Sequence, residues 1–159
     1  MNKITLPEGY KIVDAIKPQA GAAITGDYIS LKNANMAYVL VHVNQAAANT
    51  MAITVEQASA VAGTSSKAIT VVVPIWANED CATSDTLVRQ TDGVGFTTSA
   101  AQKIKQVVFQ IDPATLDIAN GFDCITVKTG ASNAGNITSA IYLVDSKYGQ
   151  ATPPTAITD

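Results

Sequence analysis

Hydrophobic and polar residues alternate along much of the chain, which is the period expected of strands that bury one face. In residues 37–45, "AYVLVHVNQ", the side chains of Tyr38, Leu40 and His42 fall on one face, and the three valines between and after them fall on the other. Valine, a β-branched residue that fits a pleated surface, occupies every second position from 39 to 43 of this segment. The pattern therefore predicts β-structure for most of the protein.

A second kind of segment is apolar without alternation. Residues 67–78, "KAITVVVPIWAN", match a strand that is buried on both faces. Pro74 lacks a backbone N–H, so we expect this strand to lie at a sheet edge or to bend at a bulge. Together with the preceding strand, it is interpreted as one arm of a hairpin over residues 54–76.

Turn-forming residues divide the chain at intervals of 8–12 residues, the spacing typical of an all-β sandwich or barrel. The predicted strands lie near residues 28–33, 36–44, 51–58, 68–76, 86–90, 94–98, 104–111, 122–129 and 137–145. The segment "DPATLDIAN" predicts a single helical turn, with Asp112 as its cap and Pro113 at its first position. Gly121 would end that turn, because glycine accepts positive φ.

The length of 159 residues suits one domain. We expect residues 21–147 to form the sandwich, because the two ends carry residues that interrupt strands. Residues 1–20 contain Pro7, Gly9 and Pro18 and are predicted to be an N-terminal arm, and residues 148–159 a C-terminal tail. Such segments either lie extended along a partner or fray in solvent.

Charge is scarce: charged residues make up 14% of the chain, against about 25% in ordinary domains. Charges are depleted at the centres of protein interfaces, so this composition suits a surface that meets another protein. The net charge is −3 and basic residues are scattered, which argues against nucleic acid as a partner. The sequence also lacks the long apolar run of a membrane span or signal peptide, so we expect a cytoplasmic protein with Cys81 and Cys124 as reduced thiols.

Residues suited to catalysis do not form a recognisable set. His42, the single histidine, lies in the middle of a predicted strand rather than at a cleft. Glu79, Asp80 and Asp85 share one loop that offers oxygen ligands to a cation or a carboxylate pair, but the loop lacks the spacing of a calcium motif. Trp76 is interpreted as a packing residue. We expect no enzymatic activity, no cofactor and no metal.

Four stretches resemble small structural proteins encoded beside the head genes of tailed phages. They are "YISLKNANMAYVLVHVNQAAANTMAITVEQASAVAGTSSKAI", "IWANEDCATSDTLVRQ", "QVVFQIDPATLDIANGFDCITVKTGASNAGNITSAIYLVDSKY" and the final "PPTAITD". The resemblance covers the chain from about residue 10 to its end. It implies a capsid decoration or cement protein with a jelly-roll-like antiparallel β-sandwich, which sits on the outside of the virion capsid as a dimer or trimer. Such proteins are assembled in the host cytoplasm and brace the joints between major capsid protein subunits.

The resemblance transfers no binding residue, so candidate contacts come from the terminal segments and from the proline that marks an edge. The candidates for contact with the capsid or with another subunit are Leu6, Tyr10, Pro74, Tyr148, Pro153, Pro154 and Ile157. Two other functions stay open. One is a virion tail or fibre module that recognises a host glycan or receptor through Trp76. The other is a hydrolase that depends on Asp80.

Overall fold

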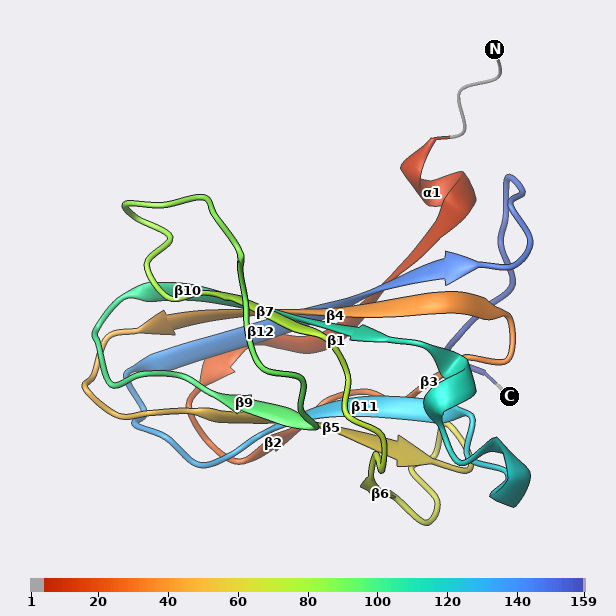
Figure 1. The fold of residues 1–159 in the computed structure, drawn as a ribbon, viewed down its shortest axis with the longest axis horizontal. Coiled ribbons are helices and arrows are strands. Elements are labelled where there is room, and N and C mark those ends of the chain that lie inside the picture. Colours follow the sequence, from red (N-terminus) through yellow and green to blue (C-terminus); the bar gives the residue numbers. More distant parts are fainter. Residues whose placement is uncertain (1–4, 159) are drawn as a thin grey trace.

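The structure, a computed structural model, describes residues 5–158, which form two antiparallel sheets packed face to face (Figure 1). The strands of sheet A are, in order, β1 (Tyr10–Ala20), β12 (Asn136–Ser146), β4 (Ala34–Gln45), β10 (Ile104–Ile111), β7 (Ile75–Asn78) and β8 (Val88–Arg89). The strands of sheet B are β2 (Ile24–Thr25), β11 (Cys124–Thr129), β5 (Ala52–Ala58) and β6 (Lys67–Ala68), with β3 (Ile29–Ser30) on β11 and β9 (Gly95–Thr97) on β5. The short helices are α1 (Leu6–Gly9), η1 (Pro113–Thr115) and η2 (Ile118–Asn120).

The strands are distributed between the two sheets in the order of a jelly roll. β1, β4, β10 and β12 lie in sheet A, whereas β2, β5 and β11 lie in sheet B. β6 and β9 pair with different parts of β5 and act as one interrupted strand. Two such sets of four strands make the eight-stranded double Greek key. The predicted all-β, jelly-roll-like antiparallel sandwich is confirmed, and β7 and β8 extend sheet A beyond β10.

Strands lie where they were predicted wherever the alternation is regular. β10 coincides with the predicted strand at residues 104–111, and β4, β5, β11 and β12 overlap their predictions closely. The helical turn is also confirmed, as the pair η1 and η2. The Asp112 carboxylate accepts a hydrogen bond of 2.9 Å from the Ala114 N–H, and Gly121 has φ of +81°.

The apolar run at residues 68–76 is a crossover between the sheets rather than one strand, so this prediction is wrong. At the start of this run, β6 pairs in sheet B. At the end of the run, β7 pairs in sheet A. Between them Ile69 and Val73 are buried while Val71 and Val72 are exposed. The predicted hairpin is therefore limited to the two residue pairs that join β5 to β6.

The predicted N-terminal arm is wrong over residues 10–20, because these residues form β1 along the edge of sheet A. β1 pairs with β12, with two irregularities that fall between Asp14 and Ile16 and between Ile16 and Gln19. Pro18 lies within the second irregularity, where the ladder needs no N–H from it. Residues 1–4 of the predicted arm, and residue 159 of the predicted tail, lie outside the described residues.

Tyr142 of β12 joins the two sheets across the core. It is fully buried, and its hydroxyl fills the gap in sheet B between β2 and β3. The hydroxyl accepts a hydrogen bond of 3.0 Å from the Val127 N–H and donates one of 2.8 Å to the Asp27 carbonyl. Burial raises the pKa of Tyr142 far above its ordinary value, so the group stays protonated and serves as both donor and acceptor.

A polar cluster around a buried lysine closes the end of the sandwich opposite the two termini (Figure 1). The Lys105 ammonium donates to the carbonyl and hydroxyl oxygens of Ser99 at 2.6 and 2.9 Å, and lies 3.1 Å from the Glu79 carboxylate. Gln45 of β4 also donates to the Ser99 carbonyl, at 2.6 Å. Burying a charge is unfavourable unless it is paired, so these contacts fix the loop between β9 and β10.

Candidate interaction surfaces

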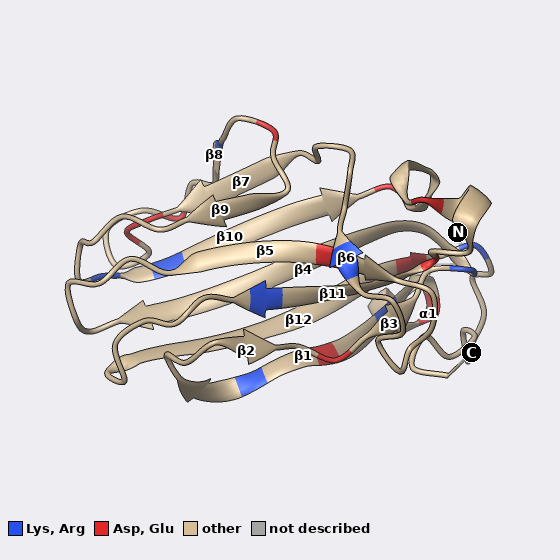
Figure 2. Cartoon of the chain, turned by 90° about the horizontal axis from the view of Figure 1, so that it is seen from below, with Lys and Arg blue, Asp and Glu red and all other residues tan. Residues whose placement is uncertain are grey.

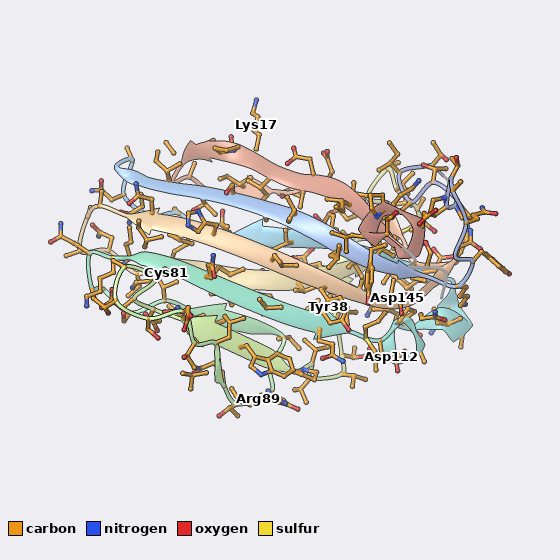
Figure 3. All side chains as sticks on the ribbon, turned by 90° about the horizontal axis from the view of Figure 1, so that it is seen from above. Lys17, Tyr38, Cys81, Arg89, Asp112 and Asp145 are labelled. Carbon is orange, nitrogen blue, oxygen red and sulfur yellow. The ribbon has the colours of Figure 1, made fainter. Side chains whose placement is uncertain are left out.

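The outer face of sheet A is apolar along its middle (Figure 3). The strand register places Ile141 of β12, Leu40 of β4, Val108 of β10 and Trp76 of β7 in one line across the sheet. Ile141 is 41% exposed, and the others are half-buried against one another. An antiparallel sheet with one face in water ordinarily carries polar residues on that face. This face therefore has the character of a surface that another molecule covers.

A second line of outward-facing residues, next to this one, is also largely apolar. It contains Ile12 of β1, Leu143 of β12 and Tyr38 of β4. Ile12 is 51% exposed and lies beside the segment that carries Ile157. We call the two lines together the sheet A face. Its residues are Ile12, Tyr38, Leu40, Trp76, Val108, Ile141 and Leu143.

The outer face of sheet B is polar by contrast, and charged residues are scattered singly over the fold (Figure 2). Lys128 and Glu56 form an ion pair of 2.6 Å on neighbouring strands, and Thr54 lies opposite Lys128. Burial opposes ionisation of Glu56, but hydrogen bonds from Lys128 and Ser66 outweigh it and lower the pKa of that carboxyl. The two faces thus differ in kind, and only sheet A presents an apolar one.

Large apolar residues are also exposed at the end of the molecule that carries α1 and the C-terminal tail (Figure 1). Leu6 of α1, Tyr148 and Ile157 are 53%, 57% and 57% exposed. We call these three residues the terminal patch. Each of these side chains offers apolar area that a partner could cover.

The segments that carry the terminal patch are held against the sandwich. The Gln150 N–H donates to the Glu8 carbonyl at 3.1 Å, which joins the tail to α1. The Ser30 N–H donates to the Ala156 carbonyl at 2.7 Å, and the Lys11 ammonium donates to the Pro153 carbonyl at 2.7 Å. The tail therefore follows a defined path, and its exposed apolar side chains have fixed positions.

The other candidate contacts lie in different surroundings. Pro153 is buried and Pro154 half-buried, so in the tail it is Tyr148 and Ile157 that face outward. Tyr10 begins β1 and lies opposite Asp145 on the margin of the sheet A face (Figure 3). Pro74 precedes β7, and its carbonyl accepts a hydrogen bond from the Gln110 N–H at 3.0 Å. The strand it precedes lies second from the edge, covered by the short β8.

Apart from Trp76, the residues of the sheet A face were not among the sequence candidates. The signal was present, since Tyr38 and Leu40 alternate with valines and both faces of that strand are apolar. A strand with two apolar faces is ordinarily central and covered on both sides. The sequence alone does not reveal that β4 belongs to a two-layer sandwich, where one of those faces stays uncovered.

In the acidic loop after β7, two carboxylates form ion pairs. Glu79 contacts Lys105, and Asp80 pairs with Lys103. Hydrogen bonds from Lys103 hold the pKa of Asp80 below its ordinary value, so this group is a base of low strength. Burial and the neighbouring Asp80 charge raise the pKa of Cys81, which favours the less reactive thiol.

His42 and Trp76 both lie on the outer face of sheet A. His42 projects outward from the middle of β4, as predicted, on the side opposite the buried valines. The Arg89 guanidinium lies 4.7 Å from the centre of the Trp76 ring. A cation over the ring occupies a surface that a sugar would need for stacking.

Within residues 5–158, no group of three or more His, Cys, Asp or Glu side chains is placed to hold a metal ion. Cys81 and Cys124 form no disulfide with each other. In the same part of the chain, no helix has the length and apolar character needed to cross a bilayer.

Among solved structures, the chain is similar to the SPBc2 prophage-derived protein YomS. The sequence identity is 12% and the TM-score is 0.49, and the likeness covers 91% of this chain and 99% of YomS. No protein-family model matches the chain, and no curated protein matches it either. At this identity, the likeness to YomS transfers no residue role to this chain.

Proposed function

We propose that the protein is a structural component of a phage virion, which decorates the outside of the capsid and braces contacts between major capsid protein subunits. It would act without catalysis and without a cofactor. The observation that carries the proposal is the terminal patch, in which Leu6, Tyr148 and Ile157 are exposed on segments that are hydrogen-bonded to a rigid sandwich. Its preformed geometry suits binding, because little conformational freedom is lost on contact.

The remaining features suit a brace. The fold is a two-layer sandwich whose sheets are joined across the core by Tyr142 and whose one end is closed by the cluster around Lys105. Glu79 and Asp80 of the acidic loop are paired with Lys105 and Lys103, which fixes the loop against the sandwich. If the protein binds the shell through several linked contacts, the overall affinity can be high even when each single contact is weak.

The test is cosedimentation with shells of the major capsid protein. We expect the double variant Tyr148→Ala, Ile157→Asp to bind at least about tenfold more weakly than the wild type, because it loses apolar contact and places a charge in the interface. Thr54→Asp, on the polar face of sheet B, is the matched control and should bind as the wild type does.

Two results would count against the proposal. Equal occupancy of shells by the double variant and the wild type would remove the terminal patch as the contact. Absence of wild-type binding to any shell would remove capsid decoration itself. A glycan-binding tail or fibre module would then be examined through saturable binding to host surface sugars, and through its loss in Trp76→Ala.

A further inference from the structure

The sheet A face carries an ordered line of charges and apolar residues. One residue from each strand lies in this line, which crosses the whole sheet. From the β1 edge to the β8 edge, the line reads Asp14, Ile141, Leu40, Val108, Trp76 and Arg89. An acid, four apolar residues and a base therefore follow one another, with the midpoint between β4 and β10.

We infer that two copies of this chain pack through their sheet A faces, about a two-fold axis that runs parallel to the strands between β4 and β10. This axis lays Leu40 of one copy over Val108 of the other, and Ile141 over Trp76. It also brings Asp14 of each copy to Arg89 of the other. A two-fold interface must be self-complementary, and this line of residues meets that condition.

The order of charges selects this axis over the other possible one. A two-fold axis perpendicular to the strands would lay β1 over β1 and bring the two copies of Asp14 together. Asp14 makes no ion pair with any residue in the described part of the chain, so that arrangement would leave its charge uncompensated. Like charges placed across an interface oppose association, whereas opposite charges fix its orientation.

The size of sheet A as a whole suits a stable dimer. With a rise of about 3.3 Å per residue and a spacing of about 4.8 Å, the five longest strands of sheet A cover about 700 Å². Stable interfaces bury about 600–1,000 Å² on each partner. Two twisted sheets also pack face to face readily, with their strands about 30° apart. The second copy thus covers the apolar area that a lone chain leaves in water.

The charged ends contribute orientation more than affinity. Arg89 already pairs with Asp92, and both side chains are more than two-fifths exposed. Exposed pairs of this kind add little to binding. The four apolar positions between the ends supply the affinity, and Trp76 with its stacked Arg89 forms a large anchor of the type found at interface centres.

The axis has a consequence that rests on the proposed function. Because the axis runs parallel to the strands, it leaves the terminal end of each copy at the same end of the dimer. Leu6, Tyr148 and Ile157 of both copies then face one capsid surface. Dimerisation is measured on the protein alone, without capsid shells. A result against the dimer can therefore be told apart from a result against capsid binding.

The test is the mass of the purified full-length chain in solution, measured by sedimentation velocity over a dilution series. We expect a dimer for the wild type. Ile141→Lys, at a position already 41% exposed, should raise the dissociation constant about a hundredfold, since it removes an apolar contact and buries a positive charge beside the Arg89 that stacks on Trp76 in the second copy. At protein concentrations low enough for the wild type to be a monomer, the two proteins should have the same unfolding midpoint. Thr54→Lys, on sheet B, should leave the dimer intact.

A charge exchange tests the orientation. Asp14→Arg should weaken the dimer, and adding Arg89→Asp should restore part of the loss, because the two positions then attract again across the interface although the stack of Arg89 on Trp76 is lost. A monomeric wild type, a dimeric Ile141→Lys, or equal dissociation by Ile141→Lys and Thr54→Lys would overturn the interface. Failure of the second charge change to restore any of the loss would overturn the axis.

Discussion

Replacement of Tyr142 by phenylalanine is expected to lower the free energy of unfolding by about 2–3 kcal/mol. The substitution keeps the ring but removes the hydroxyl that serves Val127 and Asp27 in the gap between β2 and β3. The Val127 N–H would remain buried without its partner, at a cost of about 1–3 kcal/mol, and the Asp27 carbonyl, on an exposed residue, would lose its hydrogen bond. Urea denaturation monitored by circular dichroism measures the loss.

Tyr38→Phe is the matched control for this prediction. Tyr38 lies on the neighbouring strand but points to the outer face of sheet A, so its hydroxyl closes no gap between strands. Its loss is expected to change stability by less than about 0.5 kcal/mol. If the two variants lost equal stability, the role assigned to the Tyr142 hydroxyl would be wrong.

Glu79→Gln is expected to lower the free energy of unfolding by about 2–3 kcal/mol at neutral pH. It removes the carboxylate beside the buried Lys105 ammonium and weakens the contacts to Ser99. Breaking a fully buried ion pair costs about 3–5 kcal/mol. The loss expected for Glu79→Gln is smaller because the Glu79 side chain is about one-third exposed. Asp85→Asn, in the same loop and exposed, should change stability little.

The effect of Glu79→Gln should depend on pH. Burial of Glu79 opposes its ionisation, but hydrogen bonds from Ser99 and Lys105 outweigh it, so its pKa is lowered in the folded state. A lowered pKa stabilises the fold above the pKa of the unfolded group, and this contribution is lost as pH falls through the folded pKa. The wild type and Glu79→Gln should therefore converge in stability in acid. A difference that persisted unchanged at pH below the folded pKa would contradict the assignment.

The regular strands of this fold could be predicted because their burial alternates with the pleat. In β10, residues with buried and outward side chains follow one another from Ile104 to Ile111, and the sequence shows the same period. β1 was missed because it is an edge strand with two irregularities and contains Pro18, which break the alternation. The run at residues 68–76 was misjudged because apolar residues also line a crossover that closes the core.

The candidate surfaces could be predicted only in part. Leu6, Tyr148 and Ile157 were identifiable, because they are large apolar residues in segments that break strand patterns. The burial of Pro153 depends on the path of the tail along the sandwich, which local sequence does not encode. The sheet A face depends on register, since Ile141, Leu40 and Val108 come from strands far apart in the chain.

Cosedimentation of the wild-type protein with shells of the major capsid protein from the same phage tests the central claim most directly. The protein sedimented alone is the control. The account predicts that the protein pellets with shells at a fixed ratio that saturates, and the ratio would identify the symmetry positions that are filled. Retention in the supernatant with both immature and expanded shells would contradict a role in capsid decoration.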